Sequence, residues 1–215
     1  MDKMAERLNE LCIRLLQLVY LNFLWIAFTL IGLVFAGIGP STLALFTVIR
    51  QWIRGNSDIP IFSTFWQAYR SSFKEASATG MIYLVIGWIL YVDLLYVQSF
   101  YLRALVIFVS FVYIVSLCYV FPIMAHYDWK STVLKLKCSV LFGISYLQYT
   151  LILFVVLALI YLILFMYPAA FIFFGISIGS YAIMWMTNQV FMKIETQAGL
   201  QESENRSSTS LRGWK

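Results

Sequence analysis

The amino-acid sequence predicts an all-α integral membrane protein, a helical bundle with five transmembrane helices. Of its 215 residues, 62% are hydrophobic and only 12% are charged, whereas soluble domains hold about 45–50% apolar and about 25% charged residues. A soluble fold of this size exposes roughly 30% of its chain surface and could not hide so much apolar area. The same composition excludes a disordered chain and a water-filled outer-membrane barrel.

Stretches without Asp, Glu, Lys or Arg locate the first three crossings. A hydrocarbon core of about 30 Å needs about 20 helical residues, and Leu15–Ile38 meets this requirement. This run is too long for a signal peptide, and no Ala-x-Ala cleavage site follows it. Ala76–Val97 and Ala104–Ala125 are the next two spans. Because their link is short, we expect them to form an antiparallel hairpin.

The longest uncharged stretch, Cys138–Met192, must fold back on itself. As one helix its 55 residues would reach about 80 Å, far beyond the thickness of a bilayer. Pro168 lies near its middle, and proline both ends a helix and suits the start of the next. The sequence therefore predicts Leu141–Met166 and Ala169–Val190 as spans four and five.

Basic residues set the predicted orientation. The net charge of +5 fits helix ends facing anionic lipid rather than binding to nucleic acid. With five crossings, four of the 15 Lys and Arg residues lie on the side of the N-terminus, and eight lie in loops on the other side. The positive-inside rule then places the N-terminus outside and the C-terminus in the cytoplasm of a bacterial cell (inner) membrane.

The segment between the first two spans predicts an interfacial amphipathic helical element. Gly39-Pro40-Ser41-Thr42 is typical of a helix start, and Gly55 is a normal C-terminal stop. Arg50 and Arg54 lie four residues apart within this helix, which makes it too short and too charged to cross the membrane. Two placements stay open for residues 40–54: on the membrane surface, or re-entering partway against the bundle.

A second amphipathic piece follows, with an aromatic stripe along one side. Phe62, Phe65, Trp66, Tyr69 and Phe73 recur at helical spacing. Such rings prefer the headgroup region of a membrane. Two roles fit this stripe: a lead-in helix that positions the second span, or a surface that binds lipid or a partner protein.

Two blocks of the sequence are fairly specific, Gly39-Pro40-Ser41-Thr42-Leu43-Ala44-Leu45 and Arg50-Gln51-Trp52-Ile53-Arg54-Gly55. Together with further blocks in one unbroken order over Leu15–Glu195, they resemble the YesL family of small bacterial membrane proteins. The resemblance implies an inner-membrane protein often encoded beside carbohydrate uptake systems of the ABC type. It implies no catalytic or binding residue, because the family's activity is undefined. Residues 1–195 are thus expected to be a YesL-like membrane domain.

The last 20 residues, Thr196–Lys215, fall outside the resemblance. They are rich in Ser, Glu, Gln and Asn and poor in apolar residues. We expect this segment to be a disordered cytoplasmic tail.

A few polar and small residues in the spans are functional candidates. Asp93 is the one acidic residue inside a span, and a charge in a membrane span needs an explanation. Three roles fit it: a pair with Arg103 across the hairpin, a solvated carboxylate near the interface, or a proton or cation site. Asn22 in span one either bridges to another helix or contacts a polar ligand. Gly175 and Gly179 form a small-xxx-small pair that serves either packing within the chain or dimerisation.

Enzyme motifs are missing from the sequence. It carries a single His, His126, and no paired Cys, which does not make a metal site, and it has no nucleophile elbow, Walker loop or zinc helix. We therefore expect no enzymatic activity and no cofactor. The favoured function is a non-catalytic accessory component of carbohydrate uptake that binds transporter subunits within the lipid bilayer. The alternative is a small transporter or channel for a polar solute.

Overall fold

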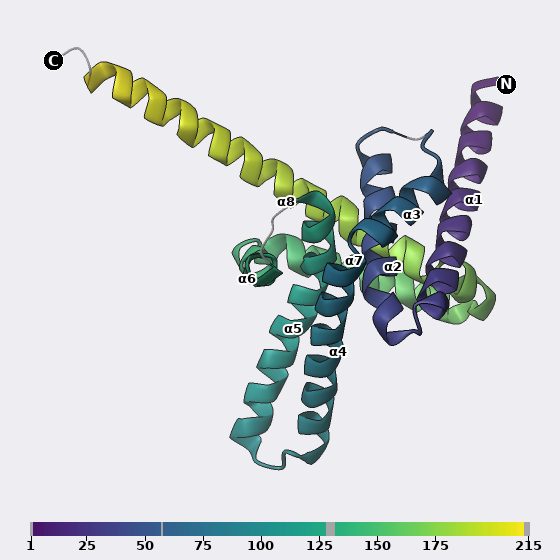
Figure 1. The fold of residues 1–215 in the computed structure, drawn as a ribbon, viewed down its shortest axis with the longest axis horizontal. Coiled ribbons are helices and arrows are strands. Elements are labelled where there is room, and N and C mark those ends of the chain that lie inside the picture. Colours follow the sequence, from purple (N-terminus) through teal and green to yellow (C-terminus); the bar gives the residue numbers. More distant parts are fainter. Residues whose placement is uncertain (1, 57, 128–131, 213–215) are drawn as a thin grey trace.

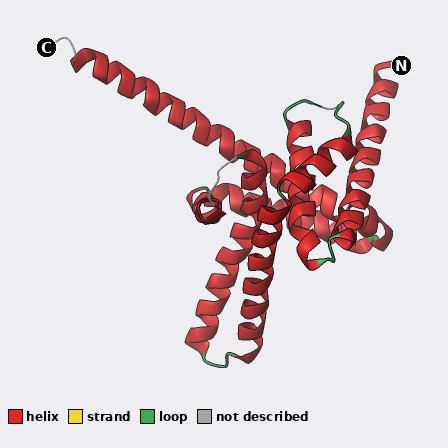
Figure 2. Cartoon of the chain, viewed as in Figure 1, coloured by secondary structure: helices red, strands yellow, loops and turns green. Residues whose placement is uncertain are grey.

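The computed structural model describes residues 2–56, 58–127 and 132–212, and within these residues it contains eight helices and no strand (Figure 1). Figure 2 shows that short loops join the helices. The all-α prediction is therefore confirmed. The helices are α1 (Asp2–Ile31), α2 (Phe35–Ile53), α3 (Ile61–Ser71), α4 (Phe73–Tyr96), α5 (Phe100–His126), α6 (Thr132–Ser145), α7 (Leu147–Met166) and α8 (Pro168–Arg212).

Five stretches of the described chain are long and apolar enough to cross a membrane. They are Cys12–Ile31 in α1, the whole of α4, α5 and α7, and Pro168–Ile194 in α8. At most 33% of any of these windows is buried inside the protein, so their outward faces present apolar side chains that suit lipid. The chain is thus a multi-pass helical membrane protein. As predicted, α4 and α5 form an antiparallel hairpin, which projects from the other helices in Figure 1.

The predicted reversal at Pro168 is confirmed, but the predicted start of span four is wrong. Helix α7 ends at Met166 and α8 begins at Pro168. The chain also breaks at Tyr146, between α6 and α7, and the Thr150 hydroxyl braces this bend by donating to the Gly143 carbonyl oxygen at 3.0 Å. A count of uncharged residues cannot detect this bend, because it carries neither a proline nor a charge.

The first predicted span also ends earlier than expected. Helix α1 stops at Ile31, and α2 begins at Phe35, so Pro40 lies inside α2 rather than at its start. Leu33 and Val34, in the turn, both have positive φ values, 59° and 61°, a conformation that residues other than glycine adopt rarely. Because every side chain in this turn is apolar, its composition did not distinguish it from a transmembrane helix.

Helix α2 is the centre of the fold. Eleven of its 19 residues are buried, and it contacts α1, α3, α4, α5 and α8. This arrangement favours re-entry against the bundle over a position on the membrane surface. The residues of α2 are mostly apolar all round, which is the pattern of an enclosed helix, and only Arg50 and Gln51 interrupt it near the end.

Helix α3 keeps the predicted amphipathic character. Phe65 and Tyr69 are buried, while Phe62 and Trp66 are exposed on the same stripe. The ring of Phe28 on α1 holds this stripe, with centroids 5.2 Å from Phe65 and 5.1 Å from Tyr69. Helix α3 is therefore fixed to α1 by aromatic packing.

The expected disorder after Glu195 differs from the structure, in which α8 continues as a helix to Arg212. Figure 1 shows this part leaving the other helices. Extending a formed helix needs no new nucleus, and the segment contains good helix formers such as Ala198, Leu200 and Glu202. Residues 213–215 of the predicted tail, and Ser57 of the turn before α3, lie outside the described residues.

Candidate functional site

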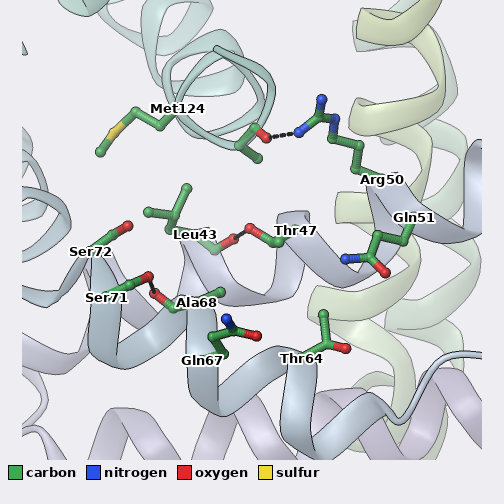
Figure 3. Close-up of a pocket in the computed structure, with 11 residues that line it drawn as sticks. Leu43, Thr47, Arg50, Gln51, Thr64, Gln67, Ala68, Ser71, Ser72 and Met124 are labelled. Atoms are coloured by element: carbon green, nitrogen blue, oxygen red, sulfur yellow. Dashed lines mark hydrogen bonds between the residues drawn. The ribbon is translucent and has the colours of Figure 1, made fainter. Parts of the chain in front are cut away.

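A polar cavity of about 270 Å³ opens where α2, α3 and the end of α5 meet (Figure 3). Three kinds of side chain surround it: hydroxyls, amides and one guanidinium, with a few apolar contacts. The lining residues are Leu43, Thr47, Arg50, Gln51, Thr64, Gln67, Ala68, Ser71, Ser72, Met124 and Ala125.

Helical spacing explains why these residues share one space. On α2, Leu43, Thr47 and Gln51 are four residues apart, so they lie on one face of the helix. On α3, Thr64 and Gln67 are three apart. The face of α2 that carries Thr47 and Gln51 therefore meets the face of α3 that carries Thr64 and Gln67.

The hydrogen bonds leave part of this lining free for a ligand. Thr47 donates its hydroxyl to the Leu43 carbonyl oxygen at 2.9 Å, and Ser71 donates to Ala68 at 3.3 Å, so these oxygens keep lone pairs for the cavity. The amides of Gln51 and Gln67 have no hydrogen-bond partner within the described part of the chain. Figure 3 shows both amides between α2 and α3. Each amide offers a carbonyl acceptor and an NH₂ donor.

Basic residues near the cavity brace the ends of helices. Arg50 turns toward α5 (Figure 3) and donates from Nη1 to the Ala125 carbonyl oxygen, where the negative end of the helix dipole favours a cation. Arg54 Nη2 lies 3.2 Å from His126 Nε2. No carboxylate lines the cavity among the described residues, so its electrostatic bias is positive.

A nearby ion pair joins α4 to α6. Lys135 Nζ lies 2.7 Å from Glu75 Oε1, with the lysine side chain 5% and the glutamate side chain 34% exposed. A lysine this buried needs such a partner, because an unpaired charge in a low-dielectric environment is costly. The pair thus fixes α6 against the start of α4, close to the cavity.

Tyr69 fixes α3, which carries the second wall of the cavity. Its hydroxyl donates to the Phe28 carbonyl oxygen at 3.3 Å. Burial raises the pKa of Tyr69 above its usual value, because desolvation penalises the phenolate. The side chain therefore stays a neutral hydrogen-bond donor.

The residues of the Gly-Pro-Ser-Thr block pack α2 against the neighbouring helices. The backbone of Gly39 crosses α4 so closely that a Cβ at this position would collide with the Ala76 carbonyl. Pro40 and Ser41 are buried. Thr42 Oγ1 accepts a hydrogen bond from Trp25 Nε1 at 3.1 Å. These residues hold α2 between α1 and α4 and do not line the cavity.

The second predicted block supplies one lining residue. Arg50 reaches the cavity, Trp52 is buried, and Arg54 contacts His126 instead. Gly55 has φ +94°, the left-handed conformation that ends a helix and favours glycine. Trp66 lies outside the cavity, 5.5 Å from the Phe28 ring.

The polar candidates in the spans do not form one site. Asn22 Nδ2 donates to the Ile172 carbonyl oxygen at 2.7 Å, which bridges α1 to α8. Asp93 and Arg103 are both described, at the other end of the α4–α5 hairpin, and no ion pair joins them. The structure thus does not form the suggested pair, and Arg103 is exposed.

Gly175 and Gly179 of α8 face α7. The Tyr161 hydroxyl donates to the Gly175 carbonyl oxygen at 3.2 Å. A Cβ on Gly179 would lie 2.5 Å from the same hydroxyl oxygen. Gly179 thus makes room for the Tyr161 side chain of the neighbouring helix, and Gly175 accepts its hydrogen bond.

Sequence reasoning missed the polar contacts that cross the bundle. The hydroxyls of Tyr83 and Ser116 lie 2.5 Å apart, and those of Ser116 and Ser139 lie 2.8 Å apart. Tyr119 and Thr150 pair at 3.0 Å. The sequence does show hydroxyl side chains within several apolar runs. It does not show which of these hydroxyls form hydrogen bonds with one another. For the same reason, nothing in one sequence indicates that Gln51 and Gln67 line one cavity.

Comparisons with known proteins support one family. A family model described as "Protein of unknown function, DUF624" matches residues 18–94. "Uncharacterized protein YteU" of Bacillus subtilis (strain 168) is 37% identical over 203 residues, which cover 92% of this chain and 91% of that protein. "Uncharacterized protein YesV" of the same strain is 30% identical over 192 residues, 86% of this chain and 92% of that protein.

A third relative carries the name that the sequence resemblance gave. "Uncharacterized protein YesL" of the same strain is 36% identical over 129 residues, 59% of this chain and 62% of that protein. No solved structure matches the chain. The similarity to YteU extends over nearly the whole of both proteins, so it includes the helices that build the cavity. The chain therefore belongs to the YesL-like family of proteins of unknown function that DUF624 describes.

Proposed function

We propose that the protein is a non-catalytic accessory component of the bacterial cell membrane that assists carbohydrate uptake by holding subunits of a carbohydrate ABC transporter. The observation that carries this proposal is the open polar cavity between α2 and α3, with two amides that have no partner among the described residues. Exposed Phe62 and Trp66 lie on the same short helix. Aromatic anchors beside hydrogen-bonding groups are typical of protein interfaces.

The chemistry of the cavity supports a binding role. Its polar side chains are hydroxyls, amides and a guanidinium, none of which exchanges a proton near neutral pH. General acid–base catalysis needs a group whose pKa lies near the working pH. A partner that brings hydroxyl, amide or carboxylate groups would find matching donors at Gln51, Gln67 and Arg50.

The carbohydrate part of the proposal rests on the resemblance to YesL-type proteins, which implies a genetic setting beside ABC-type sugar uptake. It is tested by placing a photo-crosslinking amino acid at Gln67 and purifying the full-length protein from membranes that contain a carbohydrate ABC transporter. We expect a covalent adduct with a membrane subunit of that transporter. Adducts with lipid alone would contradict the proposal.

A matched pair of variants sharpens this experiment. Replacing Gln51 and Gln67 together by Leu removes the unused hydrogen-bonding groups, so co-purification of the transporter subunit should fall about tenfold, as expected for roughly 1.4 kcal/mol of lost binding. Gln98→Leu makes the same change at an exposed position on the far end of the α4–α5 hairpin. This control should leave co-purification unchanged.

A small transporter for a polar solute is the second candidate, and the same cavity favours it. Its volume of about 270 Å³ lies near the lower end of ligand pockets, which span about 300–1,000 Å³. The buried hydroxyls of Tyr83, Ser116 and Ser139 bond to one another, and this supports packing rather than a solute path. Flux of a labelled sugar into liposomes that contain only the purified protein would favour transport and count against the accessory role.

A further inference from the structure

The turn between α1 and α2 has the composition of a membrane interior. From Leu30 to Ile38 every residue is apolar or glycine. The tip is nevertheless exposed on the protein surface: Leu33 is 82% and Phe35 is 65% accessible. Turns that face water are rich in Gly, Pro, Asn, Asp and Ser, and this turn has no polar side chain at all.

Four consecutive backbone N–H groups of this turn are paired within the chain. The amides of Gly32, Leu33, Val34 and Phe35 donate to carbonyl oxygens of residues 28–33 at 2.7–3.1 Å. In water such bonds are optional, because solvent replaces them. In hydrocarbon each unpaired backbone group costs several kcal/mol, so internal pairing is required. Two residues with positive φ are the conformational cost of closing the turn in this way.

The turn is tight and returns the chain alongside α1. Gly32 and Gly37 face each other so closely that a Cβ on Gly32 would collide with the Gly37 backbone. Further along, Trp25 of α1 bonds to Thr42 of α2. Helix α2 therefore runs antiparallel to α1, and its end lies on the side from which α1 started.

The depth of the turn follows from its contact with α4. Gly39 lies against Ala76 and Gly80, in the first two turns of α4. From Gly80, α4 continues for 16 residues to Tyr96, which is about 24 Å at 1.5 Å per residue. The α1–α2 turn thus stops well short of the far end of the α4–α5 hairpin, as Figure 1 shows.

The other helix ends meet α2 on the near side. Arg50, near the end of α2, bonds to Ala125 at the end of α5. The His126 ring lies 4.5 Å from Phe191 of α8. Lys135 of α6 pairs with Glu75 at the start of α4. These contacts gather the ends of α2, α5 and the apolar part of α8, and the start of α4, at one end of the bundle.

We propose that α1 and α2 form a re-entrant hairpin whose apolar turn, Leu30–Ile38, contacts the acyl chains of the bilayer. The hairpins α4–α5 and α7–α8 each cross and return, so the N-terminus and the C-terminus lie on the same side. Under this arrangement every Lys and Arg except Arg103 lies on one side, 14 of 15. The positive-inside rule makes that side the cytoplasm. Five crossings would instead leave four basic residues outside.

Cysteine labelling tests this topology on the full-length protein. In a chain carrying Cys12→Ser, Cys118→Ala and Cys138→Ala, single cysteines are placed at Asp2, Leu33 and Gln98. A membrane-impermeant maleimide is applied to intact cells, to inside-out vesicles and to detergent-solubilised protein. We expect D2C to react only in inside-out vesicles and Q98C only in intact cells. L33C should react at least about tenfold more slowly than either from both sides, because hydrocarbon shields it, and readily in detergent.

Each other pattern overturns the proposal in a distinct way. Reaction of D2C in intact cells places the N-terminus outside. Reaction of L33C in inside-out vesicles places the turn in the cytoplasm, as five simple crossings require. Reaction of L33C in intact cells places the turn outside, which means that α1 and α2 both cross the membrane fully. Phe35→Cys repeats the measurement at a second exposed tip residue. If L33C and F35C give the same labelling pattern, the pattern reflects the topology rather than a folding defect caused by one substitution.

Discussion

Gly39 of α2 lies directly against Gly80 of α4: a Cβ on Gly80 would come 3.0 Å from the Gly39 Cα. The glycine of the Gly-Pro-Ser-Thr block is therefore needed for a close helix crossing. Small residues at a crossing let backbones approach in membrane proteins, where packing replaces the hydrophobic effect as the driving force. Through this crossing α2 is held at the centre of the fold.

Gly39→Ala should destabilise the protein. The added methyl group would collide with the Ala76 carbonyl, and overpacking of this kind costs about 1–3 kcal/mol. Gly175→Ala is the matched control, because its Cβ would meet only the Phe171 ring at an ordinary 3.7 Å. Both changes raise helix propensity equally. The difference between the unfolding free energies of the two variants in detergent therefore measures the cost of the collision where α2 crosses α4. Equal values would contradict this view of Gly39.

Glu75→Gln should also destabilise the protein, because it leaves the buried Lys135 ammonium without its carboxylate. Breaking a buried pair costs about 3–5 kcal/mol, and the partial exposure of Glu75 reduces this to about 1–3 kcal/mol. Adding Lys135→Met should recover most of the loss, since both charges are then gone. Detergent unfolding of the single and double variants measures the effect, and a double variant less stable than the single one would refute the pairing argument.

Ser116→Ala should lower stability by about 0.5–1.5 kcal/mol, because the buried Tyr83 and Ser139 hydroxyls each lose one partner and keep another. Ser110 lies on the same helix, and its hydroxyl has no hydrogen-bond partner among the described residues. Ser110→Ala should therefore change stability much less. Thermal unfolding in lipid nanodiscs compares the two variants, and a larger loss for the Ser110 variant would exclude a bridging role for Ser116.

Much of the fold could be predicted from the sequence. Uncharged length and Pro168 were enough to place the α4–α5 hairpin and the α7–α8 reversal, because hydrocarbon thickness limits the length of a helix. The turns at Leu33 and Tyr146 could not be predicted in this way. Both lie in apolar runs without a proline or a charge, and their conformations are fixed by tertiary contacts rather than by local composition.

The candidate site was less predictable than the fold. Arg50 was found because a charge in an apolar helix stands out, and the helical spacing of Phe65 and Tyr69 indicated the buried stripe of α3. Gln51 and Gln67 were not recognised, since nothing in one sequence tells which polar faces meet. Of the alternatives for Asp93, the pair with Arg103 is not formed, because nearness across a hairpin link does not by itself bring two side chains within ion-pair distance.

The central claim is that α2 is the enclosed core of a membrane bundle rather than a helix on its surface. Hydrogen–deuterium exchange of the full chain in lipid nanodiscs tests this claim most directly, because exchange reports local opening. We predict that the amides of α2 from Leu43 to Ile49 are the most protected outside the spans and exchange far more slowly than those of α3. Exchange of α2 as fast as that of α3 would contradict the account.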